Sequence, residues 1–178
     1  MSILFGFGRK KKMSSNASTL HIQAMTESTL QNNSWTNLKT LKKKTRTQLK
    51  KQLDKVFSQF IRWRDADDSG YVNCFTCGAK KKAFGVGCIQ AGHFQSRRHM
   101  SLRWDSEFGN VQPQCAYCNI ICSGQQFVMA RRIDEIYGNG RALELEQMAK
   151  QTKKFTISDL EELIHIYKIK VKDLTSES

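Results

Sequence analysis

The sequence predicts an α+β fold in which helices flank a small central core. Apolar residues recur at three- and four-residue spacing on either side of the centre, and short runs within the centre have the character of strands. The same centre holds two pairs of cysteines that are spaced as metal ligands are. With 178 residues, 39% of them hydrophobic, the chain has apolar material for one such core.

Composition and periodicity divide the chain into four segments. Residues 1–44 are rich in Ser, Thr, Asn, Gln and Lys and follow no regular period, which predicts a basic, disordered arm. Residues 45–66 predict a basic amphipathic helix. Residues 67–138 predict the core that holds the cysteine pairs, and residues 139–178 predict a C-terminal helical segment.

The first helix is expected to end near residue 64. Its apolar stripe consists of Leu49, Leu53, Val56, Phe57, Phe60 and Ile61. Its other face is basic, and is either a solvated surface or a phosphate-contacting one. Asp, Ser and Gly in residues 65–70 then predict a turn, and residues 71–73 and 86–94 predict short strands. Pro113 is expected to fix a turn before the second cysteine pair.

Helical patterns follow the cysteines. One has apolar residues at positions 127, 130, 133 and 137 and is expected to end at Gly138, and another covers residues 141–150. In the last helix, Ser158 and Glu161 have the spacing of an N-terminal capping box. His165 lies off the apolar stripe of that helix and is expected to be exposed.

The chain is strongly basic, with 29 Lys and Arg against 16 Asp and Glu. Residues 1–50 carry a formal net charge of +9, and the remaining residues carry +4. This excess favours a polyanionic partner such as nucleic acid, although a basic arm can also be a solvated tail. No apolar run approaches the roughly 18 residues of a membrane span, and the N-terminal order of apolar then basic residues is the reverse of a secretory signal, so we expect a cytoplasmic protein.

Two Cys-x-x-Cys pairs, separated by 37 residues, are formed by Cys74, Cys77, Cys115 and Cys118. A reducing compartment keeps thiols free, and a two-residue gap can turn both sulfurs of a pair toward one ion. The sequence therefore predicts a structural Zn²⁺ held by all four thiolates, with Gly78 suited to the turn after the first pair. Cys88 and Cys122 are expected to be small buried side chains outside this site.

His93 lies between the cysteine pairs, and Asn119 directly follows the last cysteine. A metal at the base of a small core would hold these two residues on neighbouring elements. A histidine in that position can act as a base on water when its other ring nitrogen is held, and an amide oxygen can bind a hard divalent ion. A lone histidine is more often structural, so these residues alone do not establish such chemistry.

The segments Ala91-Gly-His-Phe-Gln-Ser-Arg-Arg98, Leu102-Arg-Trp-Asp105, Asn110-Val-Gln-Pro-Gln-Cys115, Cys118-Asn119 and Ser123-Gly124 resemble the phage NinG family, also called the Rap recombination proteins. The order of cysteine pair, histidine, cysteine pair and asparagine is also similar to the phage recombination endonuclease VII, within the wider HNH or ββα-metal nucleases. The resemblance covers residues 45–172 and is densest over residues 71–126. The N-terminal arm lies outside it.

The resemblance implies an HNH-like, ββα-metal nuclease core, stapled by zinc, that hydrolyses DNA phosphodiesters with Mg²⁺ or Mn²⁺. The implied substrates are branched recombination intermediates such as Holliday junctions and D-loops. His93 takes the position of the general base, and Asn119 that of a residue that binds the divalent ion or shapes its site. Asn110 matches the asparagine that fixes the loop holding the base in ordinary HNH motifs; if Asn119 is the functional asparagine, Asn110 is a turn residue.

Gly92 departs from the family pattern, because many relatives have a metal-ligating aspartate there. Either another oxygen replaces that ligand, with Asp105 the best candidate, or metal binding is weak. Asp105 could equally form an ion pair with Arg97 or Arg98. His99 is another candidate ligand, although its basic neighbours indicate a phosphate-facing loop.

The basic side chains expected to contact DNA phosphates are Lys42, Lys43, Lys44, Lys50, Lys51, Arg97, Arg98 and Arg103. The alternative function is a non-catalytic zinc module that binds branched DNA and recruits other phage recombination proteins. A sequence-specific HNH enzyme is less favoured, because no separate base-reading domain is evident. Resolution of a junction needs two symmetric nicks, so the implied task favours a homodimer, acting in the cytoplasm of a bacterial host cell.

Overall fold

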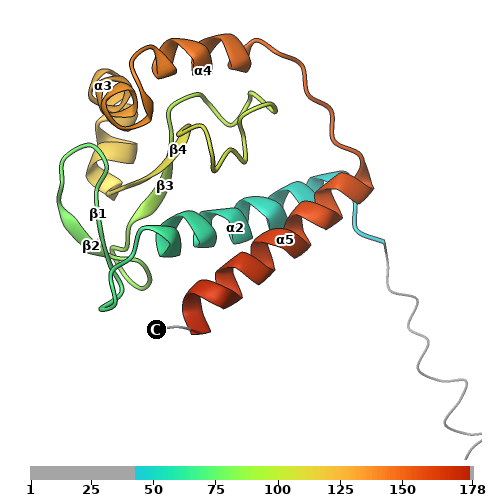
Figure 1. The fold of residues 1–178 in the computed structure, drawn as a ribbon. Coiled ribbons are helices and arrows are strands. Elements are labelled where there is room, and N and C mark those ends of the chain that lie inside the picture. The colour runs from blue at the N-terminus through green and yellow to red at the C-terminus, as the bar shows by residue number, and fades with distance from the viewer. Residues whose placement is uncertain (1–42, 177–178) are drawn as a thin grey trace, which may run out of the picture. The chain divides into compact units, whose positions relative to one another are not determined.

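Two long helices, α2 (Arg46–Arg64) and α5 (Ile157–Ser176), lie side by side in the computed structural model, which describes residues 43–176 (Figure 1). All six residues of the apolar stripe expected on the first helix are buried, so that prediction is confirmed. They pack with Leu160, Ile164 and Tyr167 of α5, and the rings of Phe57 and Tyr167 meet edge to face with centroids 4.9 Å apart. The two helices therefore bury each other's apolar faces. Residues 1–42, almost all of the expected arm, lie outside the described residues.

The starts of these two helices are fixed by reciprocal capping. At α2, the backbone N–H of Gln48 donates to Thr45 Oγ1, and the Gln48 side chain accepts from the N–H of Thr45. At α5, Thr156 and Asp159 exchange the same two hydrogen bonds. The capping box expected at Ser158 is therefore two residues too late, because Thr156 and Asp159 satisfy the same spacing at the true start of the helix.

Two antiparallel strand pairs lie between the helices in sequence. β1 (Tyr71–Asn73) pairs with β2 (Lys80–Lys82), and β3 (Gln90–His93) pairs with β4 (Val111–Gln114). The predictions for residues 71–73 and 86–94 correspond to β1 and β3, whereas β2 and β4 were not predicted. The register of the second pair sets Gly92 opposite Gln112 and His93 opposite Val111.

Pro113 lies within β4, opposite Ala91, and not in a turn as expected. Proline cannot donate to a strand ladder, so it is restricted to edge strands and similar positions. β4 pairs with β3 alone, and the carbonyl of Pro113 accepts a hydrogen bond of 2.7 Å from the N–H of Phe75. Proline is tolerated here because no second strand pairs with β4 among the described residues.

After β4 the chain forms a π turn at Tyr117–Ile121 and a 3₁₀ turn at Ser123–Gln125, followed by α3 (Gln126–Tyr137) and α4 (Arg141–Ala149). Both helices were predicted, and Gly138, with φ +106°, ends the first of them. They pack on Phe75, Phe94 and Leu102 in a second apolar cluster. The fold thus combines helices with two small strand pairs, as the predicted α+β class requires. None of the described helices is long and apolar enough to cross a membrane.

Candidate functional site

The four cysteines of the two Cys-x-x-Cys pairs meet in one cluster. The sulfur atoms of Cys74, Cys77, Cys115 and Cys118 all lie within 4.8 Å of one another. The sulfurs of Cys77 and Cys115 are 3.8 Å apart, which is about the edge of a tetrahedron whose metal–sulfur bonds are ~2.3 Å. The cluster could therefore hold a structural metal ion such as zinc.

The local backbone turns sharply after the first cysteine pair and directs N–H groups at two of the sulfur atoms. The N–H of Gly78 donates to the carbonyl of Cys74, and Gly78 has φ +74°, so the chain turns sharply after the first pair. The N–H of Cys115 points at Cys74 Sγ at 3.3 Å, and the N–H of Cys118 points at Cys115 Sγ at 3.5 Å. Such N–H groups stabilise sulfur atoms that carry negative charge.

The thiols do not titrate alike. Burial acts to raise the pKa of Cys74, but hydrogen bonds from Thr76 and from backbone N–H groups lower it to about 6. Burial raises the pKa of Cys118 to about 12, and the neighbouring thiols contribute to that rise. Four thiolates this close repel one another unless a cation lies between them, and a divalent metal supplies that charge.

His93 is the last residue of β3, and its ring is fixed by a backbone carbonyl. Its Nε2 atom lies 3.0 Å from the carbonyl oxygen of Arg103. Burial lowers the pKa of His93 below its usual value, and this outweighs the carbonyls of Arg103 and Ala91, which raise it. The nearby charge of Arg97 lowers it further. The imidazole is therefore neutral at pH 7, as a base on water must be.

Asn110 joins the two ends of the loop that follows His93. It is fully buried, its Oδ1 accepts from the N–H of Gln95 at 2.7 Å, and its Nδ2 donates to the carbonyls of Leu102 and Gln95. Its own carbonyl accepts from the N–H of Phe94, directly after His93. These contacts are those of a residue that fixes a loop, which is the role implied by the first of the two competing alignments.

Asn119 lies in the π turn after the second cysteine pair, and its Nδ2 donates to Gln90 Oε1 at 2.8 Å. Side chains alternate along a strand, so Gln90 and Gly92 project from one face of β3 and His93 from the other. The structure thus brings Asn119 to the strand that carries His93, although the two side chains make no direct hydrogen bond.

Gly92 has no side chain because another side chain occupies that space. A Cβ at position 92 would lie 2.0 Å from Oε1 of Gln114 on the facing strand. Gln114 is fully buried, and its Nε2 donates to the carbonyl of Gly124, but its Oε1 has no hydrogen-bond partner among the described residues. The sequence indicated that a ligand was missing at Gly92 and did not identify the buried amide oxygen beside it.

Asp105 does not present a free carboxylate. Its Oδ1 accepts from the N–H groups of Glu107 and Phe108, its Oδ2 accepts from that of Asn110, and the residue is 9% exposed. This network explains the residue as the stabiliser of a turn and not as a metal ligand. The expected ion pair between Asp105 and Arg97 or Arg98 is also absent from residues 43–176.

The basic residues fall into two groups. Arg103, expected to contact DNA, instead donates two hydrogen bonds to Asp54 on α2 and one to the carbonyl of Arg97, so its charge is already balanced. Arg97 and Arg98 are exposed and form no ion pair in the described part of the chain. Five lysines were also expected to contact DNA. Lys43, Lys44 and Lys51 are exposed, and Lys50 is half-buried. Lys42 lies outside the described residues.

His99 ties its loop to the rest of the fold, since its Nδ1 lies 2.8 Å from the carbonyl of Ala149 at the end of α4. His165 is exposed, as predicted. Cys88 and Cys122 are half-buried and not fully buried as expected, and Arg62 Nη1 lies 3.3 Å from Cys88 Sγ. None of these residues joins the metal cluster of the described residues.

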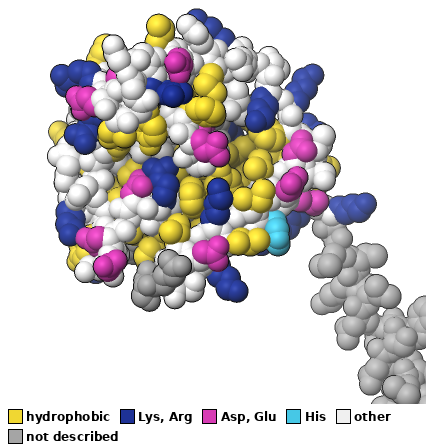
Figure 2. Space-filling view, in the orientation of Figure 1, with side chains coloured by type: hydrophobic (Ala, Val, Ile, Leu, Met, Phe, Trp, Pro, Cys, Tyr) yellow, Lys and Arg dark blue, Asp and Glu magenta, His cyan; other side chains and the backbone are white. Residues whose placement is uncertain are grey.

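Sequence reasoning also missed a basic strand. Lys80, Lys81 and Lys82 form all of β2 and are exposed. Within residues 43–176, only Lys80 forms an ion pair, with Asp67 at 2.8 Å. The strand was not predicted because three consecutive lysines lack the alternation of apolar and polar residues by which strands are recognised. On the face drawn in Figure 2, in contrast, Lys and Arg alternate with Asp and Glu around an apolar hollow, so this face carries no continuous basic surface.

The comparisons with known proteins agree with the sequence motifs. A family model described as bacteriophage lambda NinG protein matches residues 6–177. No curated protein and no solved structure matches the chain. The family match spans nearly the whole chain, including the cysteine cluster, the His93 strand and both long helices. It also includes most of the N-terminal arm, which was expected to lie outside the resemblance. The chain therefore belongs to the NinG family.

Proposed function

We propose that this protein is a divalent-metal-dependent DNA endonuclease that cuts branched recombination intermediates, with His93 as its general base. The observation that supports this best is the contact between His93 Nε2 and the Arg103 carbonyl, held in place by Asn110. This contact fixes the tautomer of the ring, so that Nδ1 carries the lone pair that a base needs. Family membership and the strongly basic composition agree with DNA as the partner.

The proposed step is hydrolysis of one phosphodiester. With Nε2–H donating to the Arg103 carbonyl, the Nδ1 lone pair of His93 takes a proton from water. The water oxygen forms a bond to phosphorus, and the ester P–O bond on the opposite side breaks. The leaving oxygen then takes a proton from solvent, and His93 returns its proton to solvent, so the neutral imidazole is restored. A neutral imidazole near pH 7, which the lowered pKa of His93 provides, can begin this step without first losing a proton.

A divalent ion would be held by amide oxygens on the face of β3 opposite to His93. The unpartnered Oε1 of Gln114 and the carboxamide oxygen of Asn119 are the oxygen donors there. When bound, Mg²⁺ or Mn²⁺ would neutralise charge on the phosphate. Neither amide carries charge and Gln114 is fully buried, so we expect weak binding of the free ion.

The four-cysteine cluster has a different role in this proposal. Four thiolates fill a tetrahedral zinc and leave no position for water, so this metal would hold the fold and take no part in hydrolysis. It joins the segment before β2 to the start of the π turn that carries Asn119. The exposed Arg97 and Arg98, four and five residues after His93, are the basic groups nearest in sequence to contact the DNA backbone.

A non-catalytic zinc module that binds branched DNA is the second candidate, and Gly92 favours it because glycine offers no metal ligand. The full chain should therefore be incubated with a four-way junction, a flap and a linear duplex, with Mg²⁺, with Mn²⁺ or with chelator. We expect metal-dependent cuts in the branched DNAs and few in the duplex. Tight binding of branched DNA without cuts under any divalent ion would support the second candidate.

A further inference from the structure

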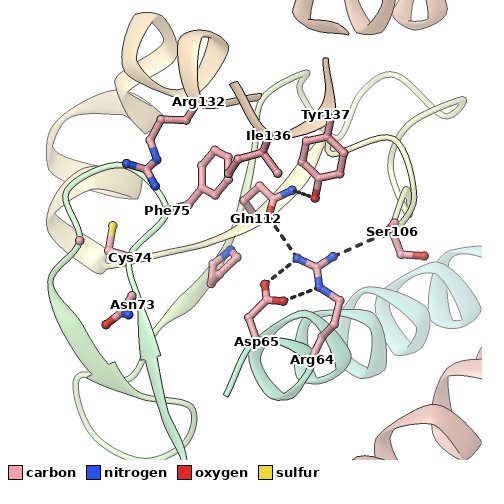
Figure 3. A pocket seen from close by; sticks show the side chains of 12 residues that line it. Arg64, Asp65, Asn73, Cys74, Phe75, Ser106, Gln112, Arg132, Ile136 and Tyr137 are labelled. Carbon is pink, nitrogen blue, oxygen red and sulfur yellow. Dashed lines mark hydrogen bonds and ion pairs between the residues drawn. The ribbon is translucent and has the colours of Figure 1, made fainter. Parts of the chain in front are cut away.

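A cavity of about 560 Å³ lies between the end of α2, the turn after β1, the strand β4 and the helix α3 (Figure 3). Its volume is within the roughly 300–1,000 Å³ that is typical of small-ligand sites. It is separate from the candidate nuclease site, because His93, Gln114 and Asn119 are not among the residues that line it. The candidate nuclease site does not account for this cavity.

The floor of the cavity is polar but carries little net charge. Arg64 donates to both carboxylate oxygens of Asp65, at 2.9 and 2.6 Å, and to Gln112 Oε1 at 3.1 Å. Gln112 in turn donates to the hydroxyl of Tyr137 at 2.7 Å. Figure 3 shows these groups converging below the cavity. Because Asp65 balances the charge of Arg64, the floor suits a neutral group with several donors and acceptors better than a phosphate.

The walls of the cavity are apolar. Phe75 and Pro113 line it on one side, and Ile136 lines it although 57% of that side chain is exposed to solvent. The hydroxyl proton of Tyr137 remains available as a donor, since the oxygen accepts from Gln112. A space with apolar walls and a polar floor fits a flat molecule with hydrophobic faces and a hydrogen-bonding edge, which describes a nucleobase.

The rim of the cavity carries two exposed polar side chains, Arg132 and Asn73. Arg132 is exposed, forms no ion pair among residues 43–176, and places its guanidinium 5.5 Å from the centre of the Phe75 ring. Asn73 is exposed at the end of β1. A cation at the mouth can contact the phosphate of a nucleotide whose base enters, and a carboxamide can read a base edge.

We propose that this cavity binds an unpaired nucleobase of branched DNA, with the base edge on the Arg64–Asp65–Gln112 floor and Arg132 on the adjoining phosphate. The inference rests on the proposed function, which makes branched DNA the partner. A branch point supplies bases that are already unpaired, and these cost least to draw out of the stack. The cavity would therefore favour branched over fully paired DNA without reading a long sequence.

The chain offers a matched pair of variants for the test. Arg131 and Arg132 are adjacent and exposed on α3, but only Arg132 lines the cavity. With 2-aminopurine at an unpaired position of a flap, Arg132→Ala should weaken binding by about tenfold and reduce the fluorescence change, while binding of paired duplex changes less than twofold. Arg131→Ala should affect both DNAs alike. Equal effects of the two variants on the flap would overturn the proposal.

A second measurement does not depend on cleavage or on branched DNA. Deoxynucleoside monophosphates are titrated into the ¹⁵N-labelled full chain, and the side-chain amide signal of Gln112 is followed. A shift of this signal that saturates with a millimolar dissociation constant and is lost in Arg132→Ala supports nucleotide binding in the cavity, even if the protein proves not to be a nuclease. No shift, together with an unchanged flap signal, overturns the cavity proposal while cleavage activity stands. Binding of free nucleotide with no competition by flap DNA overturns the DNA assignment.

Discussion

The Nε2 atom of His93 lies 3.0 Å from the backbone carbonyl oxygen of Arg103, ten residues further along the chain. This contact makes Nε2 the donor, so the lone pair of the neutral ring is on Nδ1. The Arg103 side chain is itself held by Asp54, which also accepts from the indole of Trp104 at 2.9 Å. The carbonyl that orients His93 is thus positioned by α2, 49 residues earlier in the chain.

Replacing any one of Cys74, Cys77, Cys115 or Cys118 by Ser should unfold the core and not merely lower a rate. Zinc binding in such modules contributes about 10–16 kcal/mol of folding free energy at neutral pH, and a lost thiolate removes much of it. Zinc analysis and thermal melting of the purified chain would measure this. Cys122→Ser is the control, because Cys122 lies outside the cluster. Folded wild-type protein with less than half an equivalent of zinc would contradict the prediction.

Replacing Asn110 by Ala should lower the free energy of unfolding by about 2–4 kcal/mol, because three hydrogen bonds are lost and buried backbone groups are left without partners. The cleavage rate at saturating DNA should fall as well, since the loop that orients His93 loosens. Asn119→Ala loses a single side-chain bond to Gln90 and should cost less than about 1 kcal/mol. Urea denaturation of the two variants measures both losses of unfolding free energy. Equal losses in Asn110→Ala and Asn119→Ala would mean that Asn110 does not hold the loop.

Replacing Gly92 by Ala should destabilise the fold by about 1–3 kcal/mol, because the new Cβ would lie 2.0 Å from Gln114 Oε1. Gln114→Ala removes the obstacle, so the double variant should recover part of that loss. The unfolding free energies of the wild type, the two single variants and the double variant form a double-mutant cycle, and the coupling free energy from this cycle is the quantity to measure. Additive effects of the two substitutions would show that Gln114 does not fill the space beside Gly92.

Replacing Arg97 and Arg98 together by Ala should weaken binding to all DNA forms alike, because phosphate contacts position the protein without reading sequence. Each lost contact should flatten the dependence of log affinity on log salt by about 0.9 for duplex DNA. The same measurement on a Lys50→Ala, Lys51→Ala variant decides whether the basic face of α2 contacts DNA or is only solvated. An unchanged slope in the arginine variant would remove the loop after His93 from the DNA interface.

The helices and the cysteine cluster could be predicted because their signals are local. The six apolar residues of α2 follow the helical period, and the spacing of each cysteine pair is itself a property of a short turn. The strands β2 and β4 were missed because three lysines in a row and a proline do not alternate as strand residues do. Their pairing depends on contacts with β1 and β3 that a local pattern does not contain.

The candidate site was predictable in its residue types but not in its contacts. Asp105 was expected to bind a metal ion or to pair with Arg97 or Arg98, because the sequence does not show the turn that supplies its three backbone donors. Arg103 was expected to contact DNA. The sequence does not show that its partner Asp54, which lies 49 residues earlier, is close to it in the fold. The place of Gln114 beside Gly92 depends on strand register, which no spacing rule provided.

The central claim, that His93 is the general base, is tested most directly by the single-turnover cleavage rate of a four-way junction between pH 5 and 8. Burial lowers the pKa of His93 below its usual 6.5, so the wild-type rate should fall as the pH is lowered, with a midpoint below pH 6.5. His93→Ala should lose about 10²–10⁴-fold of the rate and keep its junction affinity within a few-fold, while His165→Ala should behave as wild type. A His93→Ala variant that cuts at close to the wild-type rate would contradict the account.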